Sequence, residues 1–575
     1  MIRWCDIMYE SSDYKKEVTD YINTTIDEIN GQFPLLIDMF SRENFISTYL
    51  RSNKPLDEVK REIDEIKINT IKNALENEKL SEEYQMTATK LEQEKVGDST
   101  TRKNRRFGET LTFQMVELFR ILEKLDTTGL NDDAKCERFL NEYDDLKQSF
   151  YGNGYQELDY ETLKSLKKMI DQDMDIIVDE WTLKMSRTIK EDEPLFLENY
   201  FLNKNAIDLS RAKIVCDYAK DHNKELKLHT IIWHQAFPVS LKPYIENKSK
   251  EEKEQITLSF INQYLAYLAL WTTENSYQFT QIDVLNEIAS DSKDRLSIYR
   301  DSPWTLAFGI EPLKDLDDLS ATDKTLAINN HDEACSQMYA TILSLVRTHF
   351  PTSELIYNEY NEFLPHKCSR IIKIINSIKS YESSATGSLL DGFGMQSHYT
   401  EYYVEEKDSS VYEEITPRMI YQTTKEYAST GLNLHRSEMD FYQVNKDPEK
   451  RLKLEEAIRF ADTVNDTRTI ILWNNNETIS WRAKKGLPSP HMVNRKGEPN
   501  KNYIYYLNHY SRLNYHRNKN NGTSYNNSTT ANKETTSDNK SSTSREEGYT
   551  SNDMLTIIIG FIIISLVVIL SSIIK

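Results

Sequence analysis

The sequence predicts an α/β fold, a (β/α)8 TIM barrel, from three observations. Between about residues 145 and 512, short apolar runs alternate with longer amphipathic stretches, and strands that alternate with helices form parallel sheets. The runs are almost continuously apolar, as expected for strands buried on both faces. Glu, His, Asn and Trp residues follow them at their C-terminal ends, where barrels collect functional groups. A doubly wound sheet is the rival architecture, but no Gly-rich phosphate loop follows any run.

Seven runs are expected to form strands of this barrel. Each is short, rich in apolar residues, and ends in polar or charged residues, a pattern that favours a buried strand. The runs are residues 174–180, 228–234, 279–287, 354–361, 390–398, 433–440 and 469–477.

The chain has 575 residues, enough for more than one domain, and we expect four regions. Residues 1–144 form an all-α N-terminal region whose role and partners the sequence does not disclose. The barrel occupies residues 145–512. Residues 513–552, rich in Asn, Ser and Thr, cannot bury a core and form a disordered stalk. Residues 553–574 form a transmembrane helix.

Helical periodicity supports the assignment of the N-terminal region. Apolar residues recur there three and four positions apart, which is typical of amphipathic helices. The basic segment RKNRR at 102–106 is expected to be a solvated loop. The periodic positions are Leu56, Val59, Ile63 and Ile66 in one stripe, and Leu111, Val116, Phe119, Leu122 and Leu125 in another.

Residues 554–574 contain no charged side chain. As a helix rising ~1.5 Å per residue, this segment spans a ~30 Å hydrocarbon core. Acidic residues before it and Lys575 after it favour a single-pass protein with the barrel at the cell surface. The N-terminus has no apolar segment of a signal peptide. A lipid anchor, or a tail anchor with a cytosolic barrel, is therefore an alternative.

The formal net charge is −20, which argues against a nucleic-acid partner because phosphate binding requires a basic face. The charge is compatible with a neutral ligand such as a polysaccharide. The five cysteines are widely spaced and form no CxxC pair, so no zinc site is expected.

Two glutamates at strand ends are the candidate catalytic residues. Glu287 ends the run QIDVLNE, and Glu438 lies in HRSEMD. On a closed barrel both side chains would project into the same mouth. Glycoside hydrolysis uses two carboxyl groups, which stand about 5–5.5 Å apart in retaining enzymes. The pair therefore suits cleavage of a glycosidic bond.

Six motifs follow one another between about residues 145 and 510. They are HTIIWHQAFP (229–238), IDVLNE (282–287), YNEYN (357–361), DGFGMQSH (391–398), SEMD (437–440) and WNNNETISWR (473–482). They resemble, in the same order, the motifs of glycoside hydrolase family 10, the endo-β-1,4-xylanase family. The family's WDVVNE carries its acid/base and TELD its nucleophile. IIVDEWTLKM (176–185) resembles the family's MVTPENEMKW as a further match.

The resemblance implies a retaining, endo-acting hydrolase of xylan, a β-1,4-linked polysaccharide, that needs no cofactor and no metal. Glu438 would be the nucleophile. His398 would hydrogen-bond to it, and Asp440 would orient His398. Such support keeps a carboxylate in place and ionised.

The resemblance assigns the remaining residues in the same way. Glu287 would be the acid/base and begin protonated, and Asn286 would donate to the sugar 2-OH. His234 and Asp283 would form a supporting pair that positions the strand of Glu287. Substrate-binding residues are implied at Glu180, Lys184, His229, Trp233, Tyr360, Gln396, Trp473 and Trp481.

Several positions depart from the family motifs, in the cleft and behind it rather than at the two carboxylates. They bear on the substrate and the rate more than on the reaction type. A membrane-tethered barrel that binds glycans with little or no turnover is the alternative function, and a scaffold acting through the helical region is another. The departures are Trp181 and Asn474 in place of Asn and Gly, Ala236 and Ile282 in place of Gln and Trp, and Glu359 and Glu477 in place of Asp.

Overall fold

The computed structural model describes most of the barrel and part of the N-terminal region. Trp481, the expected stalk at 513–552 and the expected transmembrane helix at 553–574 lie outside the described residues. Within the described ranges, no helix has the length and hydropathy needed to cross a bilayer. The described residues are 12–32, 46, 49–50, 54–68, 105–150, 160–291, 296–314, 316, 319–383, 387–400, 402–405, 408–442, 448–474, 492–493 and 498–512.

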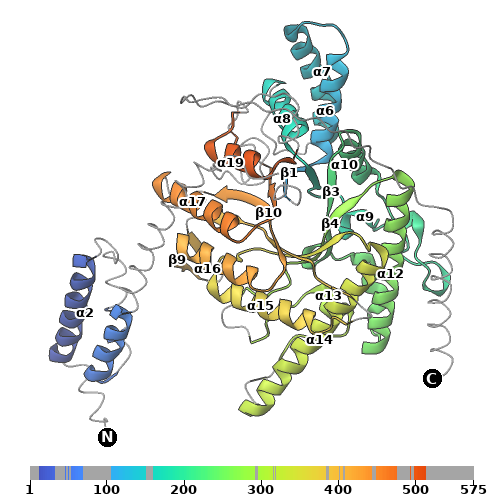
Figure 1. Cartoon of the computed structure of the whole chain (residues 1–575). Helices are drawn as coiled ribbons and strands as arrows, with labels where there is room; N and C mark the ends of the chain where they lie inside the picture. The colour runs from blue at the N-terminus through green and yellow to red at the C-terminus, as the bar shows by residue number, and fades with distance from the viewer. Residues whose placement is uncertain are drawn as a thin grey trace, which may run out of the picture. The chain divides into compact units, whose positions relative to one another are not determined.

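Eight parallel strands close into a barrel (Figure 1). They pair in the order β1, β2, β3, β4, β5, β6, β10 and β11, and β11 pairs again with β1. The predicted TIM barrel is confirmed, and each of the seven predicted runs overlaps one of its strands. The strands are β1 (Arg106–Leu111), β2 (Ile176–Asp179), β3 (Glu225–Trp233), β4 (Phe279–Asn286), β5 (Glu354–Glu359), β6 (Gly392–Met395), β10 (Asn433–Tyr442) and β11 (Thr469–Leu472).

The first strand lies before the expected start of the barrel at residue 145. β1 pairs with β11 on one side and with β2 on the other. Its sequence, RFGETL, is not an apolar run, because it contains polar residues such as Glu109. Glu109 is nevertheless fully buried. Arg106 and Leu111, expected in a loop and in a helical stripe, are the two ends of this strand. The expected boundary is therefore wrong.

A long helical connection separates β1 from β2. It runs through α6 (Phe113–Asp126), α7 (Asp132–Phe150) and α8 (Tyr160–Asp173). The side chain of Thr112 caps α6 by accepting the N–H of Met115. The helical stripe expected from Val116 to Leu125 is confirmed as the buried face of α6.

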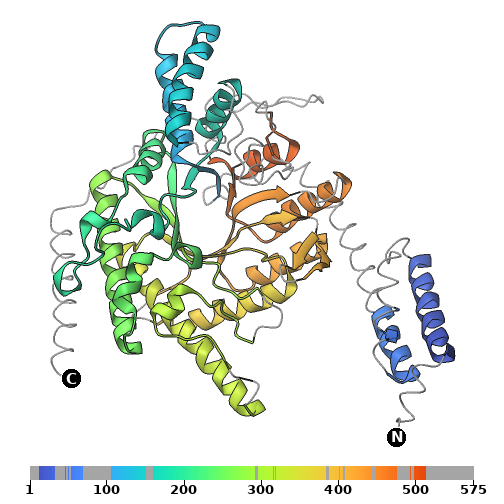
Figure 2. The same ribbon diagram turned by 180° about the vertical axis from the view of Figure 1, so that it is seen from behind.

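Helices surround the barrel on its outer side, as both views show (Figure 1 and Figure 2). α12 (Lys250–Asn275) begins at a capping box, in which Ser249 and Glu252 satisfy each other's backbone N–H groups. The further long helices are α10 (Ser210–Asp221), α12 (Lys250–Asn275), α14 (Ala321–His349), α15 (Pro365–Lys379), α16 (Pro417–Ala428), α17 (Pro448–Val464) and α19 (Lys501–Tyr510). The short elements are α9 (Met185–Thr188), α11 (Lys242–Ile245), α13 (Pro303–Ala307), the 3-10 turns η1 (Glu198–Tyr200), η2 (Lys204–Ala206), η3 (His234–Ala236) and η4 (Val239–Leu241), and strands β7 (His398–Thr400), β8 (Tyr402–Glu405) and β9 (Asp408–Glu414).

Alternate strand residues face the barrel interior and the helices, as a closed barrel requires. Ile176 and Val178 of β2 pack with Ile471 and Trp473 in a small core of their own. Ile177, between the first two, belongs to the large core beneath the helices. Side chains at the C-terminal ends of the strands lie at the mouth of the barrel.

The N-terminal region contains a helical pair made of α2 (Ser12–Gln32) and residues 56–68. Val59 and Ile63 are buried against residues of α2 such as Ile22. The helical stripe expected for this segment is confirmed.

Candidate active site

Glu438 lies on β10 at the mouth of the barrel and is 5% exposed. Its Oε1 accepts the Nδ2 group of Asn358 at 2.7 Å, and its Oε2 lies 3.2 Å from Nε2 of His398. Burial alone would raise the pKa of Glu438. Electrostatic interactions with His229 and Lys184, together with the hydrogen bond and charge of His398, outweigh burial and lower that pKa to about 2. Glu438 is therefore ionised at neutral pH.

His398 lies between two carboxylates. It begins β7, which pairs with β10 and places His398 opposite Asp440. Nδ1 of His398 is 2.9 Å from Oδ1 of Asp440. Burial lowers the pKa of His398, but Asp440 and Glu438 raise it to about 10. The three side chains make the expected contacts, and an imidazolium holds the carboxylate of Glu438 in one orientation.

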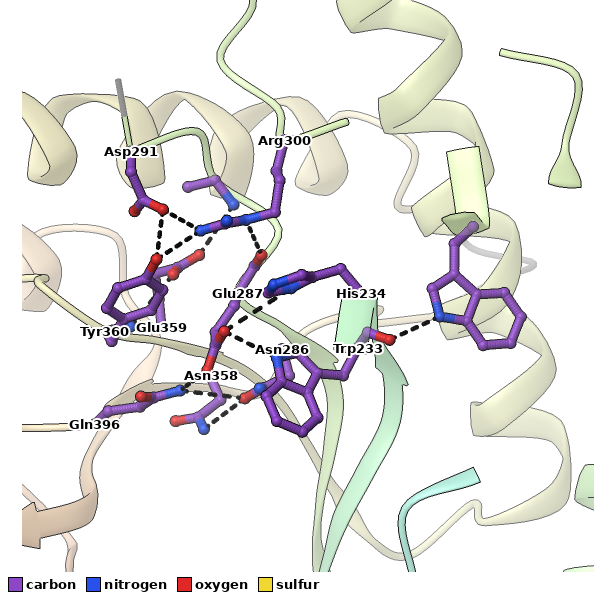
Figure 3. A network of polar contacts seen from close by, with 12 residues as sticks. Trp233, His234, Asn286, Glu287, Asp291, Arg300, Asn358, Glu359, Tyr360 and Gln396 are labelled. Carbon is purple, nitrogen blue, oxygen red and sulfur yellow. Dashed lines mark hydrogen bonds and ion pairs between the residues drawn. The ribbon is translucent and has the colours of Figure 1, made fainter. Parts of the chain in front are cut away.

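Glu287 follows β4 directly and has a left-handed backbone, with φ of +55°. Its two carboxyl oxygens accept different donors: Nε1 of Trp233 at 2.8 Å and Nε2 of Gln396 at 3.0 Å. Figure 3 shows both contacts. Trp233 and Gln396, expected to bind substrate, thus also orient this carboxyl group.

A chain of side-chain amides connects the two carboxyl groups. Gln396 donates to Glu287 and, at 3.4 Å, to Oδ1 of Asn286. Asn358 donates to the same oxygen at 2.8 Å and to Glu438. Glu287 and Glu438, expected to converge at one mouth, are therefore joined through three amides. Because both contacts of Asn286 use its oxygen, its nitrogen is oriented as the donor.

Lys184 lies near both carboxyl groups and between two indole rings. Its Nζ is 4.5 Å from the ring centre of Trp233 and 5.6 Å from that of Trp181. Burial lowers the pKa of Lys184, while Glu438, Glu180 and Glu287 oppose that shift. Trp181 is 42% exposed, so its ring lies at the edge of the site.

The expected pairing of His234 with Asp283 differs from the one observed. Asp283 is buried on β4, where it receives Lys227 at 2.9 Å and Nδ1 of His229 at 2.9 Å. His234 instead places Nδ1 3.8 Å from Oε2 of Glu287. The reason is strand alternation: His229 and Asp283 are opposed in the register of β3 and β4, whereas His234 lies beyond the end of β3.

Trp473 follows β11 and is 5% exposed. Its ring meets the rings of His229 and His398 edge to face, with centres 5.3 Å and 6.4 Å apart. It therefore forms an apolar wall beside His229 and His398, the two histidines next to Glu438.

The hydroxyl of Tyr360 is engaged within the protein, which differs from its expected contact with substrate. It donates to Asp291 and accepts from Arg300 at 2.8 Å. Lys367 lies 4.1 Å from its ring centre. Sequence periodicity gives no signal for Asp291, Arg300 and Lys367, because none of them lies in an apolar strand run. The motifs above therefore do not predict these three charged residues.

Asn358 was also missed as a site residue, although it lies in the motif YNEYN. It lies inside β5 rather than at the end, and it is fully buried. Gly394 on β6 leaves the room for it, because a Cβ there would collide with Oδ1 of Asn358. The motif YNEYN marks this segment as similar to the family, but it does not predict the hydrogen bond from Asn358 to Glu438.

Three further findings concern metal binding and the departures from the family motifs. Among the described side chains, no group of three or more His, Cys, Asp and Glu residues could hold a metal ion. Ile282 and Ala236 are buried, and Ile282 belongs to the core beneath the helices. Glu359 is fully buried and accepts the backbone N–H of Ala289 at 2.9 Å.

The chain is similar in sequence to curated endo-1,4-beta-xylanases. The chain is 19% identical over 258 residues to endo-1,4-beta-xylanase A of Caldicellulosiruptor saccharolyticus, a match covering 45% of this chain and 61% of the relative. It is 24% identical over 316 residues to endo-1,4-beta-xylanase B of Butyrivibrio fibrisolvens, covering 52% and 42%. The matches thus span less than two thirds of these relatives.

A solved structure of an endoxylanase of family 10, retrieved from a sugarcane soil metagenome, aligns over 72% of this chain and 99% of its own, with 17% identity and a TM-score of 0.47. The family model described as glycosyl hydrolase family 10 matches residues 143–315 and 336–509. Because that match covers more than half of the chain, the chain belongs to glycosyl hydrolase family 10.

Proposed function

We propose that this protein is a retaining, endo-acting glycoside hydrolase that cleaves internal β-1,4 linkages of xylan. One observation carries the proposal: an ionised Glu438 and a hydrogen-bonded Glu287 are joined by a continuous chain of amides at the mouth of a closed barrel. Membership of the family and xylanases among the relatives support the choice of substrate.

In the first step, the carboxylate of Glu438 forms a bond to the anomeric carbon, and the glycosidic C–O bond breaks. Glu287 gives its proton to the departing oxygen, which takes the bonding electron pair. The low pKa of Glu438 suits it to this role, because a nucleophile must be ionised while the acid is protonated.

In the second step, water attacks the anomeric carbon and releases Glu438. Glu287, now ionised, takes a proton from that water, so both carboxyl groups return to their starting states. The amide nitrogen of Asn286 is oriented to donate to the sugar 2-OH. Lys184, Glu180 and the walls formed by Trp233 and Trp473 would bind the sugars beside the cleavage point.

The proposal is tested by incubating the full chain with xylan and with other β-1,4-glycans over a range of pH. We expect xylan to yield oligosaccharides of intermediate length, whose new ends NMR detects first as the β-anomer. Glu438→Ala should abolish release while leaving the circular dichroism spectrum unchanged. Initial α-anomers would refute retention. Binding of xylan without any release would favour the alternative, a barrel that binds glycans without useful turnover.

We further propose that residues 553–574 tether the barrel to the outer face of a membrane, by a helix or by a lipid that replaces it. The uncharged run and the polar residues at 513–552 support this proposal. Protease added to intact cells should remove the barrel. A barrel that survives until the cells are lysed would place it in the cytosol.

A further inference from the structure

Glu287 has a backbone conformation that side chains disfavour. Its φ of +55° lies in the left-handed region, which few residues other than glycine adopt. Such a conformation persists only where neighbouring groups hold it. The N–H of Glu287 donates to the carbonyl oxygen of Asn358 at 2.9 Å. Its own carbonyl oxygen accepts Nε of Arg300 at 3.0 Å.

Arg300 approaches Glu287 along its backbone as well. The N–H of Arg300 donates to the carbonyl oxygen of Ile288 at 2.8 Å, and Ala289 forms an antiparallel bridge with Tyr299. The segment that carries Arg300 therefore lies beside the residues that follow Glu287, and its guanidinium reaches back to residue 287 (Figure 3).

A closed set of charges fixes the guanidinium of Arg300. It pairs with Asp291 and donates to the hydroxyl of Tyr360. Asp291 also receives Lys367 and the hydroxyl of Tyr360. Lys367 in turn lies 3.1 Å from Oε1 of Glu359. Two positive and two negative charges balance, so the set can be buried without leaving a charge unpaired.

We propose that Arg300 is the positioning residue for the acid/base carboxyl group of Glu287. Arg300 contacts the main chain of Glu287 through its side chain, and it holds this residue in the left-handed conformation. In that conformation the carboxyl group reaches Trp233 and Gln396. Asp291 and Tyr360 act one contact further away, by fixing the guanidinium. The inference rests on the proposed function, because it concerns the proton that Glu287 moves.

Loss of this positioning would affect only the steps that need proton transfer. A sugar leaving group departs with a proton from Glu287, whereas a dinitrophenolate leaves as an anion without one. After either departure, water needs Glu287 as a base to release the sugar from Glu438. Azide needs no base, since it attacks the anomeric carbon as an anion, breaks the ester bond to Glu438, which leaves as a carboxylate, and forms a β-glycosyl azide.

Arg300→Met tests the proposal, because Met has a similar length and no donor. We expect kcat/KM on xylan to fall about 10²-fold, as for a catalytic group misplaced by ~1 Å. On dinitrophenyl β-xylobioside, kcat/KM should not change, kcat should fall, and azide should restore kcat. Arg300→Lys keeps the charge for Asp291 but cannot also reach the carbonyl oxygen of Glu287. It should show the same pattern even if the Met variant fails to fold.

Arg347→Met is the matched control. Arg347 is as buried as Arg300, with 21% against 20% of the side chain exposed. It also pairs with an aspartate, Asp391, and donates to a main-chain carbonyl oxygen, that of Ser353, at 2.8 Å. That contact lies before β5, at the opposite end of the barrel. We expect the control to lower thermal stability and to leave the ratio of the two kcat/KM values unchanged.

Equal losses of kcat/KM on xylan and on the aryl substrate would overturn the proposal, because they would indicate a general structural effect. Full activity of both Arg300 variants on xylan would overturn it as well. Failure of the wild-type chain to hydrolyse either substrate is a different result, since it removes the proposed function itself.

Discussion

Strand β10 contributes one member of a glutamate–histidine pair at each end of the barrel. At the mouth, Glu438 pairs with His398 at 3.2 Å. At the floor, Glu354 at the start of β5 pairs with His435 at 3.2 Å. Burial raises the pKa of each glutamate, but the neighbouring histidine and hydrogen-bond donors lower it by more, so both pKa values lie below the usual range. A low pKa therefore does not by itself distinguish a catalytic carboxylate.

The two pairs differ in what surrounds them. Both oxygens of Glu354 accept side-chain donors, as both oxygens of Glu438 do: Asn433 donates to one at 2.6 Å and Gln281 to the other at 2.8 Å. Only Glu438 of these two is linked through amides to Glu287 in the contacts described above. The pair at the floor stabilises the fold, whereas the pair at the mouth is connected to the second carboxyl group that hydrolysis requires. Hydrolysis at the mouth therefore depends on Glu287 as well as on the low pKa of Glu438.

The largest expected effect separates the two glutamates by activity. Glu438→Gln removes the nucleophile and should lower kcat on xylan by at least about 10⁴-fold. Glu354→Gln should retain the kcat of the folded wild-type enzyme. Rates per folded molecule, with the folded fraction measured by circular dichroism, check this. Comparable losses in both variants would break the comparison.

The free energy of unfolding should show the reverse order: Glu354→Gln should destabilise the fold more than Glu438→Gln. Glu354→Gln leaves His435 buried without its carboxylate, and we expect the free energy of unfolding to fall by about 3 kcal/mol. Urea denaturation measures the change. If Glu438→Gln proves more destabilising than Glu354→Gln, the floor pair does not have the structural role assigned here.

The pH profile sharpens the comparison. His398→Gln removes the positive charge that lies beside Glu438, so the pKa of Glu438 should rise from about 2. The acidic limb of kcat/KM should therefore move to higher pH by about 1–2 units. His435→Gln serves as the control and should leave that limb in place. An unchanged limb in the His398 variant would contradict the assignment.

The same pair predicts how stability depends on pH. The pKa of His398 is raised to about 10, so its stabilisation is complete below pH ~6.5 and is lost as the pH rises through 10. The pKa of Glu438 is lowered to about 2, so its stabilisation is present above pH ~4.5 and is lost as the pH falls through 2. Denaturation of wild type and His398→Gln at several pH values measures the difference, which should be greatest between those limits.

The smallest expected effect uses two glycines on β6. A Cβ at Gly394 would meet Asn358 and, at 3.1 Å, Oγ of Ser437, whereas one at Gly392 would meet Nε2 of His435 at 2.7 Å. Gly394→Ala should lower kcat/KM on xylan about 10-fold by displacing the amide between the carboxyl groups. Gly392→Ala should lower the melting temperature with little change in kcat/KM. If Gly392→Ala lowered kcat/KM and Gly394→Ala lowered only the melting temperature, the distinction between a catalytic mouth and a structural floor would be refuted.

The contrast between β5 and β1 shows what sequence patterns can predict. β5 combines an apolar run with a family motif, and its position was predicted. β1 has the sequence RFGETL, in which Glu109 and Thr110 are buried. Thr110 donates to the carbonyl oxygen of Leu472 on β11 at 3.2 Å. Such a strand is stabilised by partners distant in the chain, so local hydropathy does not reveal it.

The site shows the same division. Glu287, His398 and Asp440 end strand runs, Glu438 lies two residues before the end of one, and the motifs identify all four. The partner of Asp283 was assigned to His234, although the register of β3 and β4 selects His229. Arg300 was not identified, because its role depends on a contact with a main-chain oxygen that has no sequence signature.

The sequence by itself determined the alternating strands and helices, the family and the two candidate carboxyl groups, because hydropathy periods and motif spacings are properties of the linear chain. The tertiary structure decided where the barrel begins, which imidazole pairs with which carboxylate, and how Arg300 reaches Glu287. The physical reason is that these contacts depend on strand register and barrel closure, which join residues that lie far apart in the chain.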